Sequence, residues 1–400
     1  MPALSKSDSG GGSGRLDLMV VSYSNVVDVP RGAERYAWGE AEALAQLINV
    51  AFVSSSRPAV APFEQIQLGG WTRRWYQLFG RRNPITLAFF HLISLFNPVV
   101  FVQALVLFRR RRPKAVHTHS LVALSPAIWL AARLAGARVL HTHQGFWLLC
   151  ERTNLTGKNG KPCHERQTTC LLCRSLRPPK RLQLSLVTDE VFASVWVRQR
   201  LARAGNVMPS FATGSLAPAP AEPVIDGPVV FIGELSLHKG ILVLLEAFTR
   251  AADRLSLGAT LVIGGSGPLD EHVAAAAAAD PRVTWAGELG PDERDRLLRQ
   301  ASLLVIPSTW PENSPLVFFE ALAAGLPVIA TSGGGMTEFA QYGNTEFVAP
   351  DDPDALAATL VAVLGDSERL RKLAQAARAN RSEAMPERFA RQMLDLLDSD

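Results

Sequence analysis

Two glutamates, Glu312 and Glu320, stand in the stretch STWPENSPLVFFEALAAG (residues 308–325) with seven residues between them. Taken alone, such a pair is most simply part of a solvated surface. Glu320, however, interrupts the apolar run LVFFEALAAG, and burying a carboxylate without a partner is costly. The pair therefore points to a polar ligand, whose hydroxyl groups the two carboxylates would bind.

The same stretch predicts a phosphate site. A strand is expected just before it, and Ser314 and Pro315 predict the N-cap and the first position of a helix that Gly325 ends. The unpaired amides of Leu316 and Val317, together with the positive end of the helix dipole, favour a phosphate group. A sugar nucleotide fits this combination because it carries phosphates, a ribose and a transferable sugar.

Apolar strands alternate with helical segments along both halves of the chain. The first half carries the strand patterns RLDLMVVSYS, VAFVSS, KAVHTH and RVLHTH, and the second carries PVVFIGELS, ATLVIGG, RVTWAGEL, SLLVIPS, PVIAT and TEFVAP. Continuous apolar strands separated by helices predict parallel sheets that are covered on both faces. We expect an α/β chain with two Rossmann-like parallel-sheet domains that face each other across a cleft.

A length of 400 residues is more than one core usually serves, so two domains are expected. The Pro-rich stretch APAPAEPVIDG predicts the linker between them. The predicted units are a disordered leader (1–14), an N-terminal domain (15–216), a linker (217–227), a C-terminal domain (228–385) and a last helix (386–400) that could cross back to the first domain.

The composition is that of a globular protein, with 48% apolar and 20% charged residues and a net charge of +4. The charge is uneven, because residues 57–112 contain nine arginines and one acid. This region predicts a surface that attracts lipid headgroups or phosphates, and we expect no nucleic-acid partner. The polar leader lacks the apolar core of a secretory signal, which favours the cytoplasm.

Residues 85–108 are almost entirely apolar and are followed by four arginines. By length they could span a bilayer, but His91, Asn97 and Pro98 interrupt them. We therefore favour a buried or interfacial helix pair. The aromatic and basic segment 71–82 is either a membrane-surface segment or an ordinary solvated face.

The sequence resembles the retaining glycosyltransferases of family 4, which have the GT-B fold. The resemblance rests on ENSPLVFFE with the following ALAAGLPVIATSGGGMTEFAQYGNTEFVAPDDPDALA, on FIGELSLHKGILVLLEAF, and on PRGAERYAWGEAEALA, VHTHSLVALSPAIWLAARLAG and HTHQGFWLLC in the first half. It covers most of the chain. It implies that the N-terminal domain binds the acceptor and that the C-terminal domain binds the nucleotide sugar.

The resemblance also implies site residues. Glu320 would bind the ribose, Glu312 the donor sugar, and Lys239 the diphosphate, which leaves during transfer with retention of the anomeric configuration and without a catalytic metal. Amides on the donor side would come from Gly32 and from the segment of Asn313, Ser314 and Leu316.

Four histidines end the strand patterns VHTH and LHTH. The resemblance places His143 beside the donor sugar on the acceptor side. His119 is a second candidate on that side. A histidine at a strand end is more often structural, which is the simpler interpretation of His117 and His141.

Two positions depart from the family pattern. Glu234 stands where the family commonly has an arginine that grips the diphosphate, and Arg31 occupies the first glycine position of the Gly-Gly loop. Arg31 could supply the missing charge from the opposite domain. If it does not, donor binding is weakened or the enzyme is impaired.

The four cysteines are Cys150, Cys163, Cys170 and Cys173, within 24 residues. Their spacing favours a structural zinc site in a reducing compartment, with an iron–sulfur cluster or reduced thiols as alternatives. His164 could replace one thiolate.

The predicted activity is transfer of a sugar from a UDP- or GDP-sugar to a lipid-linked or polysaccharide acceptor at the cytoplasmic membrane face. The alternatives are a catalytically lapsed, metal-clipped binding subunit and, less favoured, a sugar-nucleotide epimerase.

Overall fold

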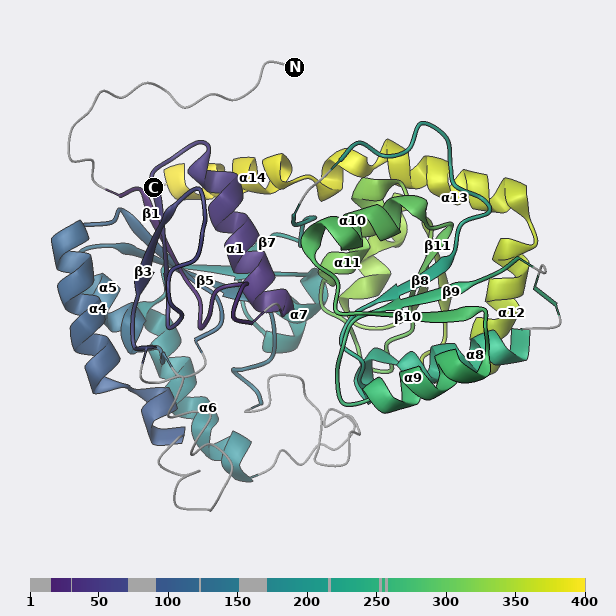
Figure 1. Ribbon diagram of the computed structural model, residues 1–400. Helices are drawn as coiled ribbons and strands as arrows, with labels where there is room; N and C mark the ends of the chain where they lie inside the picture. Colours follow the sequence, from purple (N-terminus) through teal and green to yellow (C-terminus); the bar gives the residue numbers. More distant parts are fainter. Residues whose placement is uncertain are drawn as a thin grey trace.

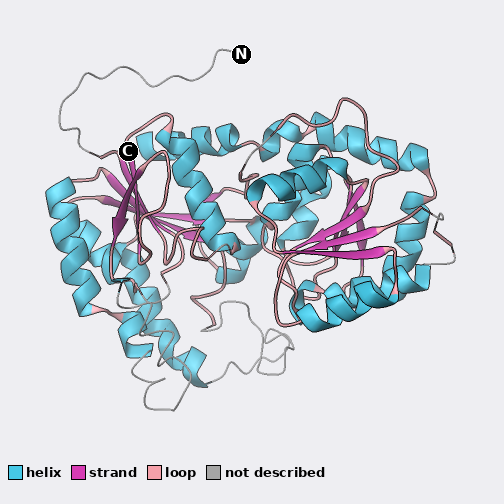
Figure 2. Cartoon of the chain, viewed as in Figure 1, coloured by secondary structure: helices cyan, strands magenta, loops and turns pink. Residues whose placement is uncertain are grey.

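The chain forms two α/β domains, each built on one parallel sheet (Figure 2). The computed structural model describes residues 16–29, 31–70, 91–121, 124–150, 171–214, 217–251, 254–255 and 258–399. The first sheet has the strand order β3-β2-β1-β4-β5-β6-β7, and the second has the order β10-β9-β8-β11-β12-β13. The predicted architecture of two parallel-sheet domains is confirmed.

The N-terminal domain places its helices on both sides of the first sheet (Figure 1). Its elements are β1 (Leu18–Val21), α1 (Gly32–Ala45), β2 (Val50–Ser54), β3 (Glu64–Gln67), α4 (Pro98–Arg111), β4 (Ala115–Thr118), α5 (Ala127–Leu134), β5 (Arg138–His143), α6 (Leu171–Gln183), η1 (Leu184–Leu186), β6 (Asp189–Phe192), α7 (Val195–Leu201) and β7 (Asn206–Val207).

The C-terminal domain repeats the alternation of strands and helices. Its elements are β8 (Val229–Ile232), η2 (Leu237–Lys239), α8 (Ile241–Ala251), β9 (Leu261–Gly264), α9 (Asp270–Ala279), β10 (Val283–Gly287), α10 (Pro291–Gln300), β11 (Leu303–Ile306), α11 (Leu316–Ala324), β12 (Val328–Thr331), η3 (Gly335–Tyr342), β13 (Thr345–Val348), α12 (Pro353–Leu364), α13 (Ser367–Ala379), η4 (Arg381–Ala384) and α14 (Pro386–Asp398).

The central strands are buried along their whole length, as β1, β2, β11 and β12 show. Burial on both faces explains why these strands are continuous apolar runs rather than alternating patterns. The edge strand β3 is partly exposed and carries the polar sequence EQIQ. Each sheet therefore places the ends of its inner strands at a buried edge, where polar side chains gather.

The last helix, α14, leaves the C-terminal domain and packs on the first (Figure 1). Phe389 of α14 stacks on Phe211 with ring centroids 4.4 Å apart, and it meets Tyr36 of α1 edge-on at 5.5 Å. Arg138 of β5 donates hydrogen bonds to the carbonyl oxygens of Leu397 and Ser399. This helix ties the two domains together at a point remote in sequence from the linker.

Residues 91–111 include the one described stretch that is long and apolar enough to cross a membrane by length and composition. The helix is interrupted at residues 96–97. Asn97 then caps α4, since its side chain accepts a hydrogen bond from the amide of Val100, and Pro98 occupies the first turn. Only 28% of the apolar window is buried.

The helix after ENSP begins one residue later than the sequence suggested. Pro315 is the N-cap of α11 and has no side chain that could accept a hydrogen bond. Ser314 was predicted as the N-cap. Its hydroxyl instead accepts a hydrogen bond from the amide of Ser210, in the other domain, at 2.9 Å. Gly325 ends the helix with a left-handed φ of 73°, as predicted.

Candidate functional site

Glu312 and Lys239 lie side by side in the C-terminal domain. The Lys239 ammonium donates to Glu312 Oε1 at 2.7 Å, and the same oxygen accepts hydrogen bonds from Ser308 at 2.6 Å and Trp310 at 3.0 Å. Burial alone would raise the pKa of Glu312, but these three donors outweigh it and hold the pKa below its ordinary value. The carboxylate therefore stays charged next to the ammonium.

A tight turn brings Lys239 to this position. Gly240 follows η2 with a left-handed φ of 71°, and a Cβ on it would stand 1.8 Å from the carbonyl oxygen of Pro307. Only glycine permits this close approach of η2 to the end of β11. The Lys-Gly pair thus places a cation beside the start of α11, where helix amides also attract anions.

Glu320 lies in α11 with its side chain 3% exposed and faces two arginines from different domains. Arg35 of α1 donates to Glu320 Oε1, which also accepts a hydrogen bond from Thr213 at 3.0 Å. Arg294 of α10 lies 3.3 Å from Glu320 Oε2. Oε2 itself is buried and has no hydrogen-bond partner among the described residues.

A small pocket opens beside Glu320. The space among its lining side chains is about 300 Å³, a volume that includes open solvent. Its lining comes from both domains, the linker and two helices, with Thr213, Ala217, Arg294 and Glu320 among its residues. An unpaired carboxylate oxygen and a guanidinium at one pocket can bind hydroxyl groups and a polar ring edge.

Further contacts join the domains next to Glu312. The Asn313 side-chain amide donates to the carbonyl oxygen of Gln144, which follows β5, at 2.7 Å. The carboxylate of Glu338 accepts hydrogen bonds from the first two amides of α7, at 2.9 Å from Val195 and 2.6 Å from Trp196. The Glu312 loop is therefore held directly against the ends of N-terminal strands.

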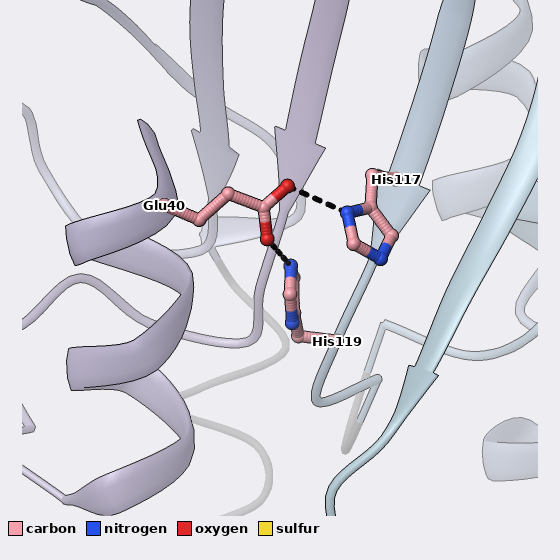
Figure 3. Close-up of side chains that lie close together, drawn as sticks. All are labelled: Glu40, His117 and His119. Atoms are coloured by element: carbon pink, nitrogen blue, oxygen red, sulfur yellow. Dashed lines mark hydrogen bonds and ion pairs between the residues drawn. The ribbon is translucent and has the colours of Figure 1, made fainter. Parts of the chain in front are cut away.

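Two of the strand-end histidines, His117 and His119, lie together next to Glu40 (Figure 3). Glu40 projects from α1 between His117 and His119, which end β4, and its carboxylate oxygens lie 2.6 Å from His117 Nδ1 and 2.9 Å from His119 Nε2. Burial would raise the pKa of Glu40, but the two rings outweigh it and lower the pKa to about 2. Burial lowers the pKa of His119. Glu40 was missed in the sequence because it lies inside an ordinary helical pattern.

His143 ends β5 and turns toward β6 rather than into open space. Its Nε2 lies 2.9 Å from Glu190 Oε2, and its ring stacks on Phe192 with centroids 4.8 Å apart. Glu190 also pairs with Arg203. Burial lowers the pKa of His143 against the opposing effect of Glu190. His143 is 3% exposed, so reaching a sugar requires its ring to turn or its neighbours to move.

The start of α1 carries the remaining predicted donor-side residues. Arg31 is the N-cap of α1 and Gly32 its first residue, and both are exposed. Glu34 in the first turn is buried, and burial raises its pKa to about 7 despite the nearby Arg31. Glu234 lies 3.5 Å from His238 and leaves Lys239 as the cation that contacts Glu312.

The cysteine prediction falls largely outside the described residues. Cys163 and Cys170 lie outside them, as does the side chain of Cys173. Cys150 is 6% exposed, packs in the hydrophobic core of the N-terminal domain and forms no disulfide with another described residue. The zinc site at these cysteines stays a prediction.

Family comparisons match each domain to glycosyltransferases. Residues 30–169 match the model described as Glycosyltransferase Family 4, and residues 227–366 match Glycosyl transferases group 1. Each match covers less than half of the chain. Together with the two parallel-sheet domains, the matches support a glycosyltransferase of the family 4 type with the GT-B fold.

The individual relatives are distant. An uncharacterised glycosyltransferase of Methanocaldococcus jannaschii is 33% identical over 34% of this chain, and the match spans 36% of that protein. An uncharacterised protein from the cps region of Klebsiella pneumoniae is 24% identical over 74% of this chain and 78% of its own length. The lipopolysaccharide 1,2-N-acetylglucosaminetransferase of Salmonella typhimurium is 30% identical over 35% of this chain and 40% of its own length.

Solved structures share the fold over nearly the whole chain. The Anabaena protein HepE, solved in complex with UDP and glucose, has a TM-score of 0.68 at 15% identity and covers 96% of this chain and 100% of its own. Sucrose-phosphate synthase of Thermosynechococcus elongatus has a TM-score of 0.70 at 18% identity, covering 96% and 98%.

Proposed function

We propose that this chain is a retaining glycosyltransferase that transfers a sugar from a UDP- or GDP-sugar without a catalytic metal. The observation that carries the proposal is the arrangement around α11. Lys239 and Glu312 stand at its start. About one turn further along, Glu320 Oε2 lies beside a pocket, 3.3 Å from Arg294 but without a hydrogen bond to any described residue. A nucleotide sugar carries an anionic diphosphate, which needs a cation, and hydroxyl groups, which need hydrogen-bond acceptors. This arrangement offers Lys239 for the first and the two glutamates for the second.

In this proposal Lys239 and the amides at the start of α11 stabilise the departing diphosphate. Because both are held in place before the substrate arrives, little reorganisation is needed as charge develops. Glu312 would accept a hydrogen bond from a hydroxyl group of the transferred sugar. The same carboxylate would orient the Lys239 ammonium. The ribose hydroxyls would donate to Glu320 Oε2.

The acceptor side is assigned to the N-terminal strand ends. His119 and His143 would face the acceptor and the reacting sugar after local rearrangement, since both rings are buried in this structure. Arg31 and Gly32, exposed at the start of α1, would close on the donor from that domain.

A lipid-linked or polysaccharide acceptor at the cytoplasmic membrane face completes the proposal. Helix α4 and the turn before it expose Leu92, Phe96, Val99, Val102 and Val106, each between 41% and 63%. Within α4, spacings of three and four residues place Val99, Val102 and Val106 on one side of the helix, and Leu92 and Phe96 are exposed just before it. Exposed arginines at positions 109–112 follow directly. An apolar stripe beside basic residues fits the surface of an anionic bilayer.

The membrane assignment is tested by co-sedimentation with vesicles. We expect binding to vesicles that contain anionic phospholipid, weakened by high salt and by replacing Val99, Val102 and Val106 with serine. Replacing the exposed Val60, which lies outside the stripe, with serine provides the matched control. Equal binding to neutral and anionic vesicles, or no binding, contradicts this part of the proposal.

The donor assignment is tested by a thermal-shift and calorimetric screen with UDP, GDP, ADP and TDP on the wild type and Glu320→Ala. We expect one nucleotide to stabilise the wild type and to lose most of its effect in the variant. The matching nucleotide sugars are then supplied with candidate acceptors, and NMR of the product reports whether the anomeric configuration is retained. Activity that survives chelators supports a mechanism without metal.

Glu234 supports the second candidate, a catalytically lapsed relative that binds sugars or lipids. It places a negative charge near Lys239, where the family resemblance leads us to expect a cation. Nucleotide binding without turnover of any sugar nucleotide, and recovery of turnover by Glu234→Arg, would favour this alternative.

A further inference from the structure

The polar cluster of Glu40, His117 and His119 is an unusual set of side chains for a protein interior. All three side chains have no exposed surface. One ligand atom from each lies within 4.8 Å of the other two (Figure 3). The proposed sugar-transfer reaction assigns no role to Glu40 or His117.

The contacts inside the cluster are incompletely satisfied. Glu40 Oε1 and His117 Nδ1 form a hydrogen bond of 2.6 Å. Glu40 Oε2 and His119 Nε2 are 2.9 Å apart, yet both atoms are buried and neither has a hydrogen bond of acceptable geometry. A ring N–H at this place would point past the oxygen. A cation that lies off the line between the two atoms could contact both.

The donor set suits zinc. Imidazole nitrogens and a carboxylate are common zinc ligands, and bonds of about 2.0–2.2 Å hold neighbouring donor atoms roughly 3–4 Å apart. The nitrogen–oxygen contacts of 2.6 and 2.9 Å are shorter than this spacing, so these donor atoms would move apart slightly to take an ion between them. The two histidine nitrogens and the Glu40 carboxylate would supply three protein ligands, and the second oxygen of the carboxylate could occupy the fourth position.

The outer nitrogens of both rings are also placed for metal binding. A ligating histidine usually donates its second N–H to an oxygen. His117 Nε2 lies 2.7 Å from the Thr142 hydroxyl. His119 Nδ1 lies 3.4 Å from the side-chain amide of Gln144, whose Oε1 is buried without a partner. If the Gln144 amide group is flipped, its oxygen takes the place of its nitrogen and can accept a hydrogen bond from the Nδ1–H group of His119.

We infer that Glu40, His117 and His119 form a structural binding site for one zinc ion that joins α1 to the end of β4. The proposed ligands include none of the four cysteines. It would fix the helix that carries Arg35 and hold the His119 ring next to β4, which leaves His143 as the histidine that turns toward the acceptor. The competing state is a carboxylate that accepts two ring N–H groups with no ion.

The first test measures bound zinc in the full-length protein after dialysis against a zinc buffer and then against zinc-free buffer. The wild type should retain one equivalent more than His119→Gln. The control His141→Gln also removes a buried, hydrogen-bonded imidazole but should retain the full amount. A wild type that retains no zinc, or the same retention in His119→Gln as in the wild type, overturns the inference.

A second test removes the cysteines from consideration. The variant with Cys163, Cys170 and Cys173 replaced by serine should still bind one zinc ion, and its cobalt form should lack the near-ultraviolet absorption of thiolate ligands. Circular dichroism verifies that each variant is folded. Loss of all zinc from a folded triple variant would assign the metal to the cysteines and overturn the inference. Neither result depends on turnover of a sugar nucleotide.

Discussion

Glu312 and Glu320 belong to one nine-residue stretch, and both are buried, yet they are neutralised in different ways. Glu312 has its cation, Lys239, within its own domain, in a turn built around Gly240. Glu320 meets Arg35, which lies 285 residues earlier on α1 of the other domain. The first pair exists whenever the C-terminal domain is folded. The second exists only when the two domains are together, so it reports on their closure.

The largest effect should come from breaking the pair within the domain. Lys239→Met should lower kcat for release of the nucleoside diphosphate by about 10²–10³-fold, the usual loss when one preorganised charge partner of the transition state is removed. Lys372→Met, on the outer face of α13, is the control and should leave kcat unchanged. A similar kcat for both variants would show that Lys239 does not act on the departing group.

Glu34 adds a third carboxylate to the comparison, one whose burial is not compensated by a cation. Because its pKa is about 7 when folded and about 4.5 when unfolded, the folded state binds more protons between these values, and the free energy of unfolding falls as pH rises through this window. Glu34→Gln should therefore be more stable than the wild type at pH 8, by about 3 kcal/mol. Urea unfolding at pH 4 and pH 8 measures the difference, which should nearly vanish at pH 4.

The pair between domains is isolated by a double-mutant cycle. Arg35→Ala, Glu320→Gln and the double variant should give a coupling free energy of about 1–2 kcal/mol in unfolding measurements, because the pair is largely buried. The cycle on Lys239 and Glu312 provides the comparison within one domain. If nucleotide displaces Arg35 from Glu320, the coupling should shrink when nucleotide is saturating; an unchanged coupling would mean that the ribose does not bind there.

The smallest effect should come from the caps of α7, one from each domain. Ser194 caps the helix from its own domain by accepting from the amide of Val197 at 3.2 Å, and Glu338 caps it from the other domain. Each alanine substitution should cost about 1 kcal/mol of stability. Only Glu338→Ala should also increase domain separation, measured as a larger radius of gyration in small-angle scattering. Equal radii for both variants would mean that this cap does not hold the domains together.

Much of the architecture was predictable from local pattern. Continuous apolar strands predicted buried parallel sheets. Gly325 and the Asn97–Pro98 pair lie at helix boundaries, because Gly325 and Pro98 act through their own backbone geometry and the Asn97 side chain caps the helix that follows it. Ser314 shows the limit. It has the side chain of an N-cap, but its hydroxyl accepts a hydrogen bond from the amide of Ser210 in the other domain, so a tertiary contact overrides the local preference.

The sequence by itself determined the two α/β domains, because the burial of each strand shows in its continuous apolar run. Only the tertiary structure decided that Arg35 neutralises Glu320 and that Glu40 lies between His117 and His119. The physical reason is that parallel sheets bring together strand ends that are far apart in sequence, and that the cleft exists only between two folded domains.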